Sequence, residues 1–268
     1  MQNHEIVALF KDKEFKAKFI ENYTKAKSTA KSNWTVTEAE AQWNLVFALL
    51  AEAYKNPELT PIHLGSVADL RICMAYVSET GLSFDKRNNE VHLVLEYLNG
   101  KPVLRVRLGY KGMMRIAMSS GLFKFIFVEL VREGDTFAWN GANKEPVFVS
   151  SARSNRAVQL GFVGFKYIDG DCLYLKVDGH ELLEIEKASK AYTEITKGSA
   201  TDSLYNTPWR DRMFEIAVWR IAYNKMRQVV SFGTLASRSK VDEQSNVQIN
   251  TEELEGFMET FGIAKEAG

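Results

Sequence analysis

Cysteine, proline and histidine are scarce in this chain of 268 residues. There are two cysteines (Cys73 and Cys172), five prolines and four histidines. Two isolated cysteines, without another Cys or His at metal-ligand spacing, provide neither a disulfide framework nor a zinc site. We therefore predict no metal site, and we expect both thiols to be small buried apolar side chains.

Long apolar runs are also missing. The longest candidate, residues 45–51, is soon followed by Glu52 and Lys55, whereas a membrane span needs about 20 apolar residues. Residues 1–5 show no basic stretch leading into an apolar core, which a secretion signal would have. We expect a chain that does not cross a membrane and that works in the cytoplasm.

The sequence lacks the common motifs of nucleotide hydrolysis and hydrolytic catalysis. It contains no G-x-x-x-x-G-K-[ST], no G-x-S-x-G and no H-E-x-x-H. Gly161 and Gly164 lie within a strand pattern with no helix after it, so a dinucleotide-binding loop is not expected. The four histidines occur in unrelated contexts. We predict no catalytic residue and no cofactor.

Charge is balanced overall but unevenly distributed. The chain has 34 basic and 34 acidic residues, yet residues 101–132 carry a net charge of +6, residues 206–240 carry +5 and residues 241–268 carry −6. Such asymmetry is typical of a basic binding surface joined to an acidic appendage. An ordinary solvated surface is the alternative interpretation.

Helical spacing of apolar residues dominates the first 80 residues. The pattern runs through residues 6–10 and 43–50 and stops at Pro57 and Pro61. Residues 66–78 predict a further helix that closes at Gly81.

From residue 91 the pattern changes to the two-residue alternation of strands. Residues 91–98 and 103–108 flank Asn99-Gly100, the strongest short-range hairpin signal. Arg105 and Arg107 alternate with apolar residues, which predicts one core face and one cationic face. The elements predicted after this hairpin are a short helix at 109–121, strands at 123–131, 157–167 and 172–177, a loop or weak hairpin at 136–149 and a helix at 181–191.

A long helix is predicted from Pro208 to about residue 230, because proline is tolerated in a first helical turn. At 100° per residue, one broad side is apolar and the opposite stripe is formed by Arg212, Ile216, Arg220, Tyr223 and Arg227. Guanidinium groups suit phosphates and aromatic rings can stack on bases. A solvated face with arginine stems lying over neighbours is the alternative.

An ordered set of motifs resembles a known family. It consists of Leu108-Gly109-Tyr110-Lys111-Gly112-Met113-Met114, Ala117, Ser120-Gly121, and Val131-Arg132-Glu133-Gly134-Asp135 with Phe137, preceded by Gly81-Leu82 and followed by Pro208-Trp209. Over residues 64–230 the chain resembles the RecT family of phage and prophage single-strand annealing proteins. Many members have Lys-Lys and Arg-Arg pairs in the last helix, where this chain has Val218-Trp219-Arg220 and Tyr223-Asn224-Lys225.

The resemblance implies an α+β fold in which a long helix crosses an antiparallel sheet, similar to the core of eukaryotic annealing mediators of recombination. It implies a non-enzymatic, ATP-independent protein that coats single-stranded DNA as a homo-oligomer, ring or helical filament, and pairs it with a complement in homologous recombination. The implied partners are single-stranded DNA, annealed duplex, a 5′ to 3′ exonuclease and the host single-strand binding protein, in the bacterial cytoplasm.

We expect two basic walls to bind DNA together. Arg105, Arg107, Lys111 and Arg115 form the first wall, and Arg212, Arg220, Lys225 and Arg227 form the second, with Tyr110, Trp209 and Tyr223 available for base stacking. The expected parts of the chain are a helical N-terminal region (1–62), an annealing and oligomerising core (63–236) and an acidic tail (237–268) with a small amphipathic helix at 252–261.

Two other functions stay open at this point. A metal-dependent nuclease could use Asp135, Asp169 and Asp171 on the same basic surface. A protein-interaction module could instead bind an acidic partner through its basic faces.

Overall fold

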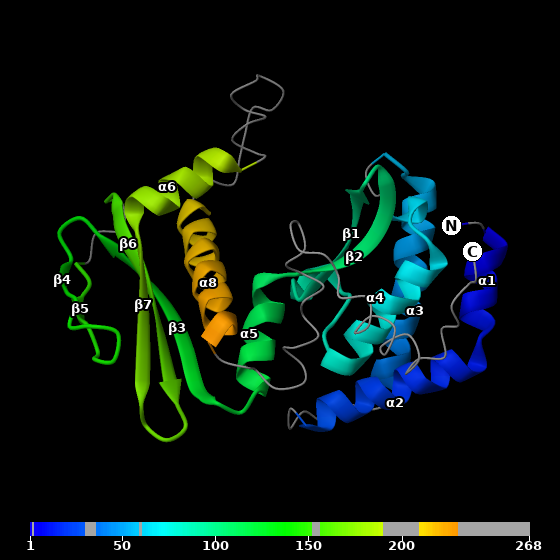
Figure 1. The fold of residues 1–268 in the computed structure, drawn as a ribbon, viewed down its shortest axis with the longest axis horizontal. Helices are drawn as coiled ribbons and strands as arrows, with labels where there is room; N and C mark the ends of the chain where they lie inside the picture. The colour runs from blue at the N-terminus through cyan, green and yellow to red at the C-terminus, as the bar shows by residue number, and fades with distance from the viewer. Residues whose placement is uncertain (2, 30–35, 59–60, 152–155, 190–208, 230–268) are drawn as a thin grey trace. The chain divides into compact units, whose positions relative to one another are not determined.

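A computed structural model describes residues 1, 3–29, 36–58, 61–151, 156–189 and 209–229. They form two compact units, Met1–Ser119 and Ser120–Phe232, the second described as far as residue 229 (Figure 1). The fold combines helices with antiparallel strands, which confirms the predicted class. The tail at 237–268, with the helix predicted at 252–261, lies outside the described residues.

The first unit is mainly helical. Its elements are α1 (Asn3–Lys11), α2 (Lys13–Thr29), α3 (Val36–Lys55), the 3-10 turn η1 (Pro61–Leu64), α4 (Val67–Thr80), the 3-10 turn η2 (Lys86–Asn88), β1 (Val91–Leu98), β2 (Lys101–Leu108) and α5 (Tyr110–Ser119). Helix α4 begins and ends where the sequence predicts. The Ser66 hydroxyl accepts from the Asp69 N–H and the Asp69 carboxylate accepts from the Ser66 N–H, while Gly81 ends the helix at φ +64°.

The β1–β2 hairpin confirms the prediction made from Asn99-Gly100. Both turn residues have positive φ, 50° and 78°, as a tight two-residue turn requires. Strand β2 begins at Lys101 rather than at 103, because Leu98 pairs with Lys101 and Tyr97 pairs with Pro102 right up to the turn.

The start of α5 lies directly against the backbone that precedes β1. The Gly109 N–H donates to the Glu90 carbonyl at 2.8 Å. A Cβ on Gly109 would lie 2.1 Å from the Asn89 carbonyl oxygen, and one on Gly112 would lie 2.1 Å from the Glu90 carbonyl oxygen. Only glycine permits this approach, which gives a physical reason for the Gly-Tyr-Lys-Gly run.

The second unit is a three-stranded antiparallel sheet with attached helices. Its elements are β3 (Phe123–Arg132), β4 (Thr136–Ala138), β5 (Val147–Val149), β6 (Val158–Tyr167), β7 (Cys172–Asp178), α6 (Gly179–Ala188) and α8 (Arg210–Val229), and the sheet order is β3-β6-β7. Within the described part of the chain the strands form three separate sheets rather than one, since β1 pairs there only with β2 and β4 only with β5.

Both faces of the β3-β6-β7 sheet are covered. Helix α8 lies on one face, where a Cβ on Gly161 would be 2.3 Å from Val218 and the Phe165 ring centroid lies 6.0 Å from that of Trp219. On the other face Phe162 packs against Phe137 and Phe148 around the β4–β5 hairpin. Figure 1 shows α8 and this hairpin on opposite sides of the sheet. The long basic helix α8 therefore packs on an antiparallel sheet, as predicted.

Candidate nucleic-acid interface

The cationic face predicted for the hairpin is present but carries a carboxylate. Residues 92, 94 and 96 of β1 share this face with residues 103, 105 and 107 of β2, because they are cross-strand pairs. The Arg107 side chain is 56% exposed and donates to Glu96 at 3.0 Å. Arg105 lies 3.8 Å from the same carboxylate, but its side chain is only 6% exposed. Of the two arginines, Arg107 is the one exposed to solvent.

Helix α5 presents one exposed cation and holds another in a partly buried ion pair. Lys111 is exposed. Arg115 donates to both Glu90 carboxylate oxygens, at 2.8 and 3.0 Å, and Glu90 also accepts from the Ser83 N–H at 2.7 Å. Burial raises the pKa of Glu90 and lowers that of Arg115, because it disfavours the charged form of each. Tyr110 is half-buried.

The polar stripe predicted on α8 needs correction at Tyr223. This side chain is 1% exposed and packs beside Trp219, with 5.8 Å between ring centroids, so it belongs to the core. Arg220 and Lys225 are exposed. Arg227 lies over the Tyr223 ring at 5.8 Å.

Three ion pairs involve the first turns of α8, and two of them join the helix to other elements of the second unit. Arg212 pairs with Glu215 at 2.5 Å on the helix itself. Asp211 accepts from Arg132 of β3 at 2.6 Å, and Arg210 donates to Glu186 of α6 at 2.7 Å. Arg132 and Arg210 thus have structural partners, although both contribute to the basic composition of their segments.

Among the described residues, the most exposed aromatic ring of each unit is more exposed than Phe47, Tyr54 and Phe125, whose exposed fractions are 50%, 38% and 41%. Trp209, predicted from sequence, is 64% exposed just before α8. Tyr97, next to the turn of the β1–β2 hairpin, is also 64% exposed. The sequence pattern does not single out Tyr97, because alternation places it with the apolar residues of β1; its proximity to the Asn-Gly turn is the only local signal that it would be exposed.

The aspartates of the nuclease alternative do not form a metal site. Asp135 accepts from the backbone N–H groups of Arg132 and Ser151, at 2.8 and 2.7 Å, which lowers its pKa and occupies its oxygens in a turn. Asp169 and Asp171 flank the β6–β7 turn. Among the residues described, no group of three His, Cys, Asp or Glu side chains is placed to hold a metal ion.

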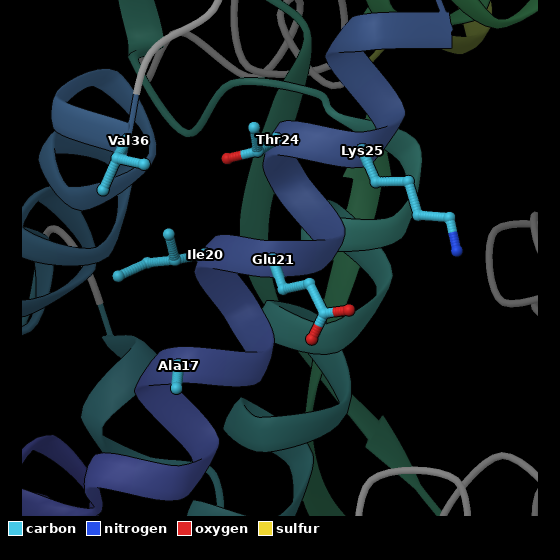
Figure 2. Close-up of a pocket in the computed structure, with 6 residues that line it drawn as sticks. All are labelled: Ala17, Ile20, Glu21, Thr24, Lys25 and Val36. Atoms are coloured by element: carbon cyan, nitrogen blue, oxygen red, sulfur yellow. The ribbon is translucent and has the colours of Figure 1, made fainter.

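A pocket of about 550 Å³ lies between α2 and the start of α3 (Figure 2). Ile20 and Thr24 point toward the end of α3 that carries Val36, while Glu21 and Lys25 point away. Its lining includes one acidic and one basic residue, so it has no excess positive charge with which to hold a phosphate.

Comparison with known proteins decides the family. A model of the RecT family matches residues 44–217. The chain belongs to the RecT family. RecT proteins anneal single-stranded DNA in phage recombination. No curated protein matches the chain. No helix in the described part of this RecT protein is long and apolar enough to cross a membrane.

The RecT match includes part of the candidate interface. Arg107, Lys111 and Trp209 lie within residues 44–217, and so do the close-approach glycines of α5. The exposed cations Arg220 and Lys225 lie beyond the matched range, in the last part of α8. The basic character of this helix end is a property of this chain that the match does not cover.

Proposed function

We propose that this protein is an ATP-independent annealing protein that coats single-stranded DNA as a homo-oligomer and pairs it with a complementary strand in homologous recombination. Membership in the RecT family is the observation that carries the proposal. The exposed cations support it: Arg107 and Lys111 in the first unit, Arg220 and Lys225 in the second. Such groups neutralise backbone phosphates without reading sequence.

Annealing needs no nucleotide on energetic grounds. Base stacking and pairing release about 1.4 kcal/mol per step. The barrier is kinetic, because two polyanions repel one another and intrastrand hairpins hide bases. A protein that neutralises phosphates and stacks bases on exposed rings such as Tyr97 and Trp209 lowers both obstacles.

Repetition of the site along an oligomer supplies affinity that one subunit lacks. Four phosphate contacts with a salt slope of about −0.7 each imply about a fiftyfold loss of affinity for a fourfold rise in salt. Contacts of neighbouring subunits on one strand add together. We further propose that one strand binds the cations of both units.

The remaining parts of the proposal concern organisation and partners. We propose that the helical region 1–62 precedes the annealing core 63–236 and that the acidic tail 237–268 contacts the host single-strand binding protein. A 5′ to 3′ exonuclease would supply the single strands, in the cytoplasm of a bacterial host. These proposals rest on membership in the RecT family.

Duplex formation between complementary oligonucleotides, without nucleotide, tests the proposed function. We expect the protein to accelerate duplex formation and to form rings or filaments on the strand in electron micrographs. Unchanged annealing rates would contradict the proposal. Cleavage that depends on Mg²⁺ and stops with EDTA would favour the nuclease alternative, and failure to retard single-stranded DNA at low salt would favour the protein-interaction module.

Replacing Lys111 with alanine tests the exposed cation of α5. We expect weaker binding to single-stranded DNA and a salt slope that is smaller by about 0.7, because one phosphate contact is lost. The melting temperature should stay nearly unchanged, since Lys111 is exposed. Lys55→Ala, a change at an exposed lysine at the end of α3, is the control. Equal salt slopes for the two variants would remove Lys111 from the interface.

Replacing Trp209 or Tyr97 with alanine tests base stacking. We expect each change to weaken binding about fivefold, which corresponds to about 1 kcal/mol for one lost stack. Trp209→Phe and Tyr97→Phe retain a ring and should keep most of the affinity. If the alanine and phenylalanine variants bind equally, the rings do not stack on bases.

A further inference from the structure

Glu96 lies between two arginines of very different exposure. Its carboxylate is 3.0 Å from the exposed Arg107 and 3.8 Å from the buried Arg105. The Glu96 side chain is itself 30% exposed. All three residues lie on the same face of the β1–β2 hairpin. A carboxylate in this position makes the contact with Arg107 that a phosphate oxygen of DNA would make.

We propose that Glu96 is a positioning residue that competes with DNA phosphates for Arg107. The inference rests on the proposed function, because it concerns the same DNA-binding face. In the free protein Glu96 orients the guanidinium of Arg107. When a strand binds, a phosphate replaces Glu96 as the partner of Arg107, and no covalent bond changes.

The buried Arg105 makes this exchange favourable. When a carboxylate loses its only cationic partner, its free energy rises, and the rise is larger the more the carboxylate is buried. Glu96 keeps Arg105 nearby after Arg107 has turned to a phosphate, so its charge remains compensated. Because Arg105 is 6% exposed, it cannot follow Arg107 to the strand. The two arginines therefore have different roles: Arg105 holds Glu96, and Arg107 contacts DNA.

The Arg115–Glu90 pair shows why the exposed pair is the exchangeable one. Glu90 is 13% exposed and is bound by both Arg115 and the Ser83 N–H. Opening that pair would leave the largely buried Glu90 carboxylate without its guanidinium partner. Exposed ion pairs are weak and open readily in water. Of these two pairs on the first unit, Arg107–Glu96 is the one that a phosphate can open.

Competition of this kind keeps each DNA contact weak and reversible. Complementary strands must find their register, and contacts that release quickly permit repeated trials. A carboxylate within the site lowers the affinity of each contact without removing the cation. Loss of Glu96 should therefore tighten binding, the reverse of what loss of a binding residue does.

The affinity of Glu96→Gln for single-stranded DNA tests the proposal. We expect about two- to fivefold tighter binding at low salt, which is the strength of an exposed ion pair. The gain should vanish at high salt, because the pair in the parent protein is then already screened. Glu184→Gln is the control, since Glu184 pairs with Lys187 on α6 at 2.8 Å and its replacement gives the same change in net charge, although the Glu184 side chain is 53% exposed against 30% for Glu96. Equal effects of the two variants would overturn the proposal.

A double-mutant cycle shows whether Glu96 acts through Arg107. In an Arg107→Ala background, Glu96→Gln should change affinity less than it does in the parent protein. An undiminished gain would show that Glu96 acts only as a distant negative charge, which contradicts the proposal. Glu96→Asp keeps the charge but shortens the side chain by one methylene, which weakens the contact with Arg107, so it should also tighten binding even if the Gln variant is unstable. Absence of DNA binding by the parent protein would contradict the proposed function instead.

Discussion

Replacing Gly112 with alanine is expected to lower the free energy of unfolding by about 2 kcal/mol. The new Cβ would lie 2.1 Å from the Glu90 carbonyl oxygen. Because this atom belongs to the backbone, α5 or the start of β1 must shift. Overpacking usually costs up to about 3 kcal/mol, and we take this upper value here. Alanine regains about 1 kcal/mol as a better helix former.

Urea denaturation of Gly112→Ala measures this loss as a lower midpoint. Lys111→Ala is the control within the same helix turn, and because Lys111 is exposed its free energy of unfolding should stay within about 0.5 kcal/mol of the parent value. If Gly112→Ala unfolds at the parent midpoint, α5 does not press against the Asn89–Glu90 backbone as described.

Replacing Arg115 with alanine is expected to lower the free energy of unfolding by about 2 kcal/mol, less than for a fully buried ion pair, because the side chains of Arg115 and Glu90 are 27% and 13% exposed. Two hydrogen bonds to Glu90 are lost, and the largely buried carboxylate keeps only the Ser83 N–H among its hydrogen-bond donors described above. Loss of an exposed phosphate-binding residue, in contrast, would leave the free energy of unfolding unchanged. Chemical denaturation of Arg115→Ala at neutral pH measures the expected loss.

The destabilisation of Arg115→Ala should diminish as the pH falls. Burial already raises the pKa of Glu90 in the folded protein, and removal of Arg115 raises it further. Above the raised pKa of folded Glu90, the unpaired carboxylate is charged and the full loss of stability is present. As the pH falls from that value to the ordinary glutamate pKa of about 4.3, Glu90 takes up a proton in the folded protein and the loss becomes smaller. A loss that stays constant from pH 7 to pH 4.5 would contradict the assignment.

A neutral replacement of both partners provides the control for Arg115. Glu90→Gln combined with Arg115→Met removes both charges and roughly keeps their volume. We expect the double variant to recover most of the stability that Arg115→Ala loses, because no charge is left without a partner. A double variant as unstable as Arg115→Ala would show that packing, rather than charge, accounts for the effect.

Local signals in the sequence predict the elements well. Asn99-Gly100 fixes the β1–β2 hairpin, and Ser66 and Gly81 fix the ends of α4, because each acts on backbone atoms a few residues away. The grouping of strands into three sheets was not predictable in this way. Alternation tells which face of a strand is apolar but not which strand lies beside it, and the covering of Phe162 by Phe137 and Phe148 is a tertiary contact.

The candidate site was predictable for side chains whose environment is local. Arg107, Lys111 and Trp209 are exposed as expected. Arg115 follows Lys111 at helical spacing, but its partner Glu90 lies 25 residues earlier in the chain, beyond the reach of spacing rules. Tyr223 falls within the arginine stripe in helical projection, and spacing along the helix does not reveal its tertiary burial beside Trp219.

The ion pair between Glu186 and Arg210 also closes a loop of the chain. Arg210, at the start of α8, donates two hydrogen bonds, at 2.7 and 3.2 Å, to Glu186 near the end of α6, and the two residues are 24 positions apart. The entropy of closing such a loop rises only slowly with the number of residues inside it. A change in the number of residues between Glu186 and Arg210 should therefore alter the free energy of this contact only slightly.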